Sequence, residues 1–157
     1  MKHLLNITRQ TRENFIRLIE TSTIEELNEV PAGFSNNIIW NLGHIMTSQQ
    51  LLCYQLAGLN PIIDPAYILA YKKGTRPEGF VNAEEINTIK ELIRSTIDQL
   101  EKDLDNDLFV NYNAFTTSFG VELKSTNDAV QFFPVHDALH YGYALAIKKA
   151  LNKTDKN

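Results

Sequence analysis

The sequence predicts an all-α fold in which four helices pack as one bundle. Apolar residues recur at steps of three and four along four long segments, which is the period of an amphipathic helix. No segment shows a strong alternating pattern of the kind that half-buried strands show. The chain has 157 residues and is 43% hydrophobic, which suits one domain with one core. We therefore expect a single domain over residues 1–157, with its core within 2–151.

The first two helices are expected at residues 2–21 and 35–57. Ser35 is a good N-cap residue, and Gly58 and Pro61 form an ordinary stop signal after the second apolar stripe. The stripes are Leu4, Ile7, Thr11, Phe15 and Leu18 in the first helix, and Ile38, Leu42, Ile45, Leu52 and Leu56 in the second.

The third and fourth helices are expected at residues 82–104 and 127–151. Asn82 followed by Glu85 is typical of a capping box at the start of the third helix. Its apolar seam is Ile86, Ile89, Ile93, Ile97, Leu100 and Leu104. Pro134 falls inside the fourth helix, where a missing N–H donor and a ring clash predict a kink.

Two long connections, residues 59–81 and 105–126, join these helices. Tyr67–Tyr71 suits a short helical turn in the first connection. Phe109–Val110 and Phe119–Val121 suit short extended pieces in the second. Long loops in compact domains often cover functional sites. The sequence is compatible with two roles for these connections, a lid over a site and a passive excursion on the surface.

Charge and composition exclude several classes of partner. The formal net charge is -4, and no Lys/Arg run is present, which argues against nucleic acid. No stretch approaches the ~20 apolar residues that span a bilayer, and no secretory apolar region follows the N-terminus. We therefore expect a cytoplasmic protein with no membrane partner. Cys53 is the single cysteine, which rules out an internal disulfide framework.

His136 and His140 are the first candidates for metal ligands. Residues four apart on a helix share a face, and this pair lies on the inward stripe of the fourth helix. Buried imidazoles need partners for their ring nitrogens. A shared metal ion would supply them, and so would hydrogen bonds to core groups or water.

His44 is the third candidate. It lies beside the apolar seam of the second helix and can face the bundle axis, while the neighbouring Gly43 would let another helix approach closely. His3 belongs to the first turn of the first helix and is interpreted as solvated. Cys53 follows His44 by nine residues, which places it on the opposite helical face, so we interpret it as packing.

With these residues placed, the chain resembles the DinB-like superfamily of bacterial metal-binding bundles over about residues 5–151. Trp40–Ile45 (WNLGHI) is similar to the helix-two motif of that family, an aromatic followed by Leu-Gly-His. His136–Gly142 (HDALHYG) is similar to its helix-four motif, and Gly74–Pro77 (GTRP) to the loop before helix three. Family members often carry Arg and Gln near the end of the second motif, where this chain has Tyr141 and Tyr143.

The resemblance implies an up-down-down-up bundle and a bound divalent ion. Its ligands would be one histidine of helix two and two of helix four, here His44, His136 and His140, and the ion would be zinc, nickel or a similar metal. It also implies a homodimer. Some members transfer bacillithiol, mycothiol or glutathione, and others resemble mycothiol-dependent maleylpyruvate isomerases.

Three histidines leave at least one coordination position open, which favours a metal-dependent transferase or hydrolase. The expected substrate is a small molecule, with a low-molecular-weight thiol as the first candidate from the resemblance. The alternative is a non-catalytic dimeric bundle with a structural metal. Asp137 is either a partner that orients an imidazole or a solvated carboxylate, and we assign no catalytic residue or organic cofactor site. Aromatic residues that can shape a pocket are Trp40, Tyr67, Tyr71, Phe115 and Tyr141.

A ferritin-like di-metal site is excluded by the residues around the histidines. That design needs Glu three residues before each helical histidine ligand. The residues at those positions are Asn41, Phe133 and Asp137.

Overall fold

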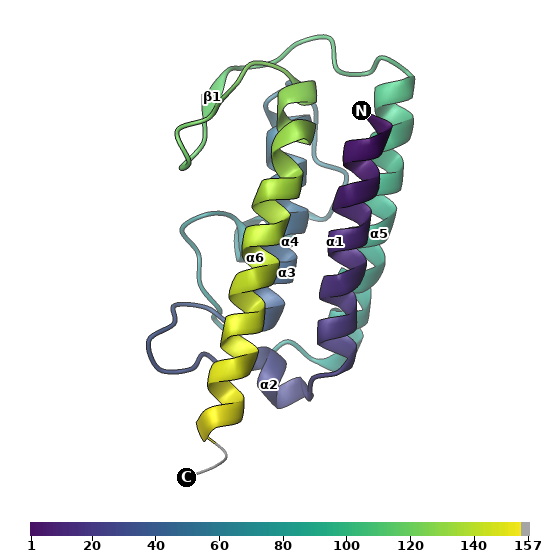
Figure 1. Cartoon of the computed structure of the whole chain (residues 1–157). Helices are drawn as coiled ribbons and strands as arrows, with labels where there is room; N and C mark the ends of the chain where they lie inside the picture. The colour runs from purple at the N-terminus through teal and green to yellow at the C-terminus, as the bar shows by residue number, and fades with distance from the viewer. Residues whose placement is uncertain (155–157) are drawn as a thin grey trace.

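The computed structural model describes residues 1–154 and is mostly helical, which confirms the expected all-α class. Its elements are α1 (Lys2–Glu20), α2 (Ile24–Asn28), α3 (Ile38–Gln49), the π-helical segment η1 (Gln50–Gln55), α4 (Pro65–Tyr71), α5 (Ala83–Asp105), β1 (Phe115–Thr116), β2 (Glu122–Leu123) and α6 (Thr126–Thr154). Four long helical segments, α1, α3, α5 and α6, lie side by side (Figure 1). No helix among the described residues is long and apolar enough to cross a membrane.

The start of α5 agrees with the expected capping box. The Asn82 side chain accepts a hydrogen bond from the Glu85 N–H, and the Glu85 carboxylate accepts one from the Asn82 N–H, both at 3.0 Å. Two of the N–H groups that the first turn leaves unpaired are thereby satisfied.

The start of α3 differs from the prediction. Ser35 is exposed and lies outside the helix, and Asn37 is the N-cap residue, because its side-chain oxygen accepts from the Trp40 N–H at 2.9 Å. The other end of the same amide donates to the Asn28 carbonyl oxygen at 2.9 Å. The contact with α2 therefore sets where α3 begins. The capping propensity of single residues does not predict this start, because Ser35 and Asn37 are both good N-cap residues.

The first long connection contains α4, a two-turn helix that includes the expected Tyr67–Tyr71 turn. The second contains a β-hairpin, in which Phe115 pairs with Leu123 and Thr116 with Glu122. The extended piece expected at Phe119–Val121 was therefore wrong, and Phe109–Val110 lies in no strand.

The hairpin turn explains that difference. The Thr117 N–H donates to the Val121 carbonyl oxygen at 2.9 Å, and the Gly120 N–H donates to the Thr117 carbonyl oxygen at 3.0 Å. Gly120 has φ +78°, a left-handed conformation that glycine adopts without steric cost. Phe119 and Gly120 thus lie in the turn, between the strands.

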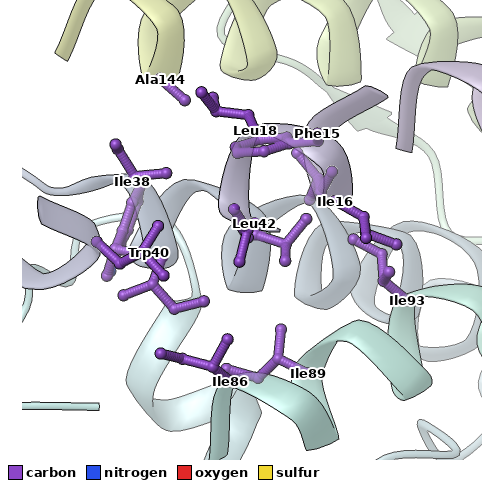
Figure 2. Packing of buried hydrophobic residues seen from close by; sticks show 14 of the residues in the cluster. Phe15, Ile16, Leu18, Ile38, Trp40, Leu42, Ile86, Ile89, Ile93 and Ala144 are labelled. Carbon is purple, nitrogen blue, oxygen red and sulfur yellow. The ribbon is translucent and has the colours of Figure 1, made fainter. Parts of the chain in front are cut away.

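The apolar core is divided between the two ends of the helices. Figure 2 shows part of the larger cluster, where Phe15, Leu42 and Ile89 come from three different helices. The second cluster includes Cys53, which is fully buried, as expected for a packing residue. Helix α6 continues through Pro134 without a break, and the kink expected there stays a prediction.

Candidate metal centre

Three histidines from two helices meet at one place in the structure. His44 lies on α3, and His136 and His140 lie on α6. Their ring centroids are 5.4 Å apart for His44 and His136, 4.6 Å for His44 and His140, and 4.7 Å for the α6 pair. One nitrogen from each ring can be chosen so that all three lie within 4.8 Å of one another. The structure brings the predicted ligands together, and their binding of a metal stays a prediction.

Hydrogen bonds fix which nitrogen of two of these rings carries the proton. The Nδ1–H of His44 donates to the Tyr71 carbonyl oxygen at 2.7 Å, because a carbonyl can only accept. The Nδ1–H of His140 donates to Asn41 Oδ1 at 2.8 Å. The Asn41 amide is itself oriented, because its Nδ2 donates to Asn36 Oδ1 and to the Asn37 carbonyl oxygen, both at 2.8 Å. Nε2 of both rings is therefore unprotonated in the neutral form and can act as a ligand. The Ser48 hydroxyl lies 3.3 Å from Nε2 of His44 and can donate to it.

His136 is oriented by a buried carboxylate. Its Nδ1 lies 3.3 Å from Asp137 Oδ1, and the Nε–H of Arg12 donates to Asp137 Oδ2 at 2.8 Å. Arg12 also donates to the side-chain oxygen of Gln49, and the Gln49 amide donates to the Thr96 carbonyl oxygen at 2.9 Å. This chain of hydrogen bonds connects α6 to α1, α3 and α5.

Of the two readings of Asp137, the structure favours the carboxylate that orients an imidazole. The Asp137 side chain is 0% exposed, so it is not a solvated group. Sequence reasoning missed Arg12, although a signal existed. The inward face of α1 carries Arg12 together with Leu5, Thr8, Phe15 and Ile19, all of which are buried. A charged residue at such a position needs a buried partner. Ile7, which the predicted stripe placed on this face, is exposed.

The local environment keeps the imidazoles of His44 and His140 neutral and the Asp137 carboxyl ionised. Burial lowers the pKa of His44 from 6.5 to about 4. Burial, together with the two neighbouring histidines, lowers the pKa of His140 to about 3. Burial opposes ionisation of the Asp137 carboxyl, but the charge of Arg12 and the hydrogen bond with His136 outweigh it and lower its pKa.

Two residues of the WNLGHI motif position His44. Trp40 stacks on the His44 ring with centroids 4.8 Å apart and planes inclined by 10°. A Cβ on Gly43 would lie 2.6 Å from the Tyr71 ring. Glycine is therefore required there for α4 to approach α3, which is what brings the Tyr71 carbonyl oxygen to His44.

A pocket of about 460 Å³ opens in front of the histidines. Leu51 and Leu52 reach it from η1, a π-helical stretch of the kind that is frequent at functional sites. Phe115 and Phe119 reach it from the hairpin region, and Lys73 reaches it from the first long connection. Both long connections therefore contribute to the wall.

Of the aromatic residues expected to shape a pocket, Trp40 and Phe115 line this one. Tyr67, Tyr71 and Tyr141 belong to the larger core cluster instead. His3 is exposed and lies outside the histidine group, and Cys53 is packed in the core, so neither joins the three ligands.

The donor set fits a divalent metal ion. Three neutral imidazoles on fixed rings are the ligand set of open catalytic zinc sites, where a further position is left for water or substrate. Among residues 1–154, the group of potential His, Cys, Asp and Glu ligands that includes these histidines has no fourth member. An ion held here would face the pocket.

Fold and site define a helical protein with a preorganised three-histidine centre beside a pocket. Comparison with protein families agrees with this class, because the model of the DinB superfamily matches residues 7–144. The chain belongs to the DinB superfamily. A search of curated proteins finds no match.

Proposed function

We propose that the protein holds one divalent ion, zinc or nickel, through Nε2 of His44, His136 and His140, and uses it in a transferase or hydrolase reaction on a small molecule. Transfer of a low-molecular-weight thiol is the first candidate reaction. The observation that carries the proposal is the hydrogen-bonding of the rings. Nδ1 of each contacts an oxygen of the protein, at 2.7 to 3.3 Å, which leaves Nε2 for a shared ion. The Ser48 hydroxyl, 3.3 Å from Nε2 of His44, is the contact that the ion would replace.

The chemistry follows from the charge of the ligands. Neutral imidazoles leave a bound ion its full 2+ charge, which lowers the pKa of a water or thiol in the open position. The protein's own contribution is orientation and exclusion of water. Asp137 and Arg12 hold His136, and the apolar walls of the pocket surround the open side.

The alternative is a non-catalytic dimeric bundle with a structural metal. Structural zinc sites are closed by four protein ligands, often cysteines. The described residues offer three histidines at a pocket, and Cys53 is buried elsewhere, so the geometry supports the open, reactive site.

We also propose the up-down-down-up order for the four long helices. The supporting contacts are at the helix ends. Lys2 pairs with Asp105 at 3.5 Å, so α1 begins where α5 ends. Lys148 pairs with Glu26, so α6 ends beside α2, near the start of α3. In Figure 1 the N-terminus and the start of α6 lie at the same end.

A homodimer is proposed as well. Apolar side chains on the outer face of α6 support it, since Val135 and Leu145 are each more than 40% exposed and neither lines the pocket. Light scattering should give twice the mass of one chain, and a monomer at every concentration would contradict it.

The test of function combines metal analysis with turnover. The metal-loaded protein is assayed with bacillithiol, mycothiol and glutathione against electrophilic acceptors, and with esters and amides. We expect turnover of at least one pair that is lost on chelation and in His136→Ala. His3→Ala is the matched control, because His3 is exposed and outside the cluster. Turnover that does not depend on metal would contradict the metal-dependent reaction, and no turnover with any substrate would favour the non-catalytic bundle.

A further inference from the structure

The only charged side chain that lines the pocket, among the described residues, is a lysine. Among the residues that the structure describes, no Asp or Glu lines the pocket, and Lys73 is the one Lys or Arg that does. Lys73 is exposed, and no ion pair of its ammonium is found within residues 1–154.

The buried carboxylate behind the pocket already has a cationic partner. Asp137 lies behind His136 and pairs with the Arg12 guanidinium at 2.8 Å, so their charges largely cancel. The chain as a whole has a formal charge of -4, yet its pocket carries positive charge only. A divalent ion on three neutral imidazoles would increase that excess.

The remaining wall is mostly apolar. Leu51, Leu52 and Phe132 line it from the helical side, and Phe115 and Phe119 line it from the hairpin side. Walls of this kind, with a few polar groups placed at defined points, are typical of pockets for small organic ligands.

We propose that the pocket binds a small organic anion, an apolar body that carries one carboxylate, with Lys73 as the residue that recognises the carboxylate at the rim. The inference deepens the proposed function, since it names the substrate class of the same pocket. The Lys73 contact itself does not require the metal, and the two proposals therefore fail separately.

Trp40 offers a direct readout, because it is the single tryptophan of the chain and lines the pocket. Its fluorescence is followed while the metal-free and the zinc-loaded protein are titrated with 4-phenylbutyrate and with the neutral 4-phenylbutanamide. In the metal-free protein we expect the acid to bind about three- to fivefold more tightly than the amide, as suits one solvent-exposed ion pair. Zinc should increase this preference.

Variants of two adjacent lysines separate the recognition of the carboxylate from general charge. Lys73→Ala should abolish the preference of the metal-free protein for the acid, and Lys73→Glu should reverse it. Lys72→Ala is the matched control, because Lys72 is also exposed but does not line the pocket, and it should retain the preference. Phe119→Ala should weaken the binding of the acid and of the amide equally.

Equal binding of acid and amide by the metal-free wild type would overturn the proposal. An unchanged preference in Lys73→Ala would overturn it as well, and so would an absence of binding by either probe. Zinc content is measured in parallel. A protein that binds no zinc but keeps the Lys73-dependent preference contradicts the proposed function alone, and one that binds zinc without the preference contradicts this inference alone.

Discussion

At the scale of single residues, the site depends on atoms that never touch the pocket. The Tyr71 carbonyl oxygen, the Asn41 amide and the Asp137 carboxylate each contact Nδ1 of one histidine. Such partners orient the rings, and their loss typically costs about 10- to 100-fold in metal affinity. Substitution of the residues that hold these partners in place therefore tests whether the partners orient the histidines.

Gly43→Ala should displace Tyr71, because the new Cβ would lie 2.6 Å from its ring. We expect the free energy of unfolding to fall by about 1–3 kcal/mol and zinc affinity to fall about tenfold or more as His44 loses its carbonyl partner. Urea denaturation and competitive zinc titration measure the two effects. Gly142→Ala is the control, since a Cβ there meets nothing within 4 Å. Equal behaviour of the two variants would contradict the packing role of Gly43.

Arg12→Met should leave the Asp137 carboxylate buried without its cation. We expect a loss of about 3–5 kcal/mol in the free energy of unfolding and weaker zinc binding as His136 loses its fixed partner. Arg94→Met is the matched control, because Arg94 pairs with Glu13 near the surface and should cost no more than about 1 kcal/mol. Similar losses in both variants would show that burial of the Arg12 pair does not matter.

At the scale of elements, the ends of the helices separate what local sequence determines from what packing determines. The capping box of α5 uses two residues three apart, so it was predictable from the sequence. The start of α3 depends on Asn37 bonding to α2, and the hairpin depends on the pairing of β1 with β2. These contacts join residues nine and eight positions apart and leave no apolar periodicity in the sequence, so neither was predicted.

Asn37→Ala tests that reading of α3. The substitution removes the N-cap bond to Trp40 and the bond to Asn28, and we expect a cost of about 1–2 kcal/mol in thermal or urea unfolding. Ser35→Ala, at the position that the sequence alone favours, should be close to neutral. A larger loss for Ser35→Ala than for Asn37→Ala would contradict the observed helix start.

The candidate site also combines residues that the local sequence predicts with residues that only the fold brings together. The inward stripes of the second and fourth helices pointed to His44, His136 and His140, and the structure brings them together. The Arg12–Asp137 pair joins residues 125 positions apart, so only the fold reveals it. The position of Lys73 at the pocket could not be predicted from the sequence either, because its loop has no apolar periodicity from which to place its side chains.

At the scale of the whole molecule, the burial of neutral histidines makes the free energy of unfolding depend on pH. The unfolded chain protonates His44 and His140 near pH 6.5, whereas the folded protein keeps them neutral down to about 4 and about 3. The unfolded state therefore binds more protons in this range, and stability falls as the pH falls from 6.5 towards 4.

We expect the metal-free protein to lose roughly 2–3 kcal/mol of unfolding free energy through His44 over this pH range. Urea denaturation at a series of pH values measures the loss. His44→Gln should show a shallower slope, and His3→Ala, an exposed control, should follow the wild type. A wild-type stability that rises on acidification from pH 6.5 to 4 would contradict the assigned neutral state.

A crystal structure of the metal-loaded protein, with anomalous data at the metal edge, would locate the ion on the three histidine rings. We expect a single anomalous peak per chain, about 2.0–2.1 Å from Nε2 of His44, His136 and His140, with a further position open to the pocket. A peak at another place, a fourth protein ligand that closes the site, or no peak in metal-saturated crystals would contradict this expectation.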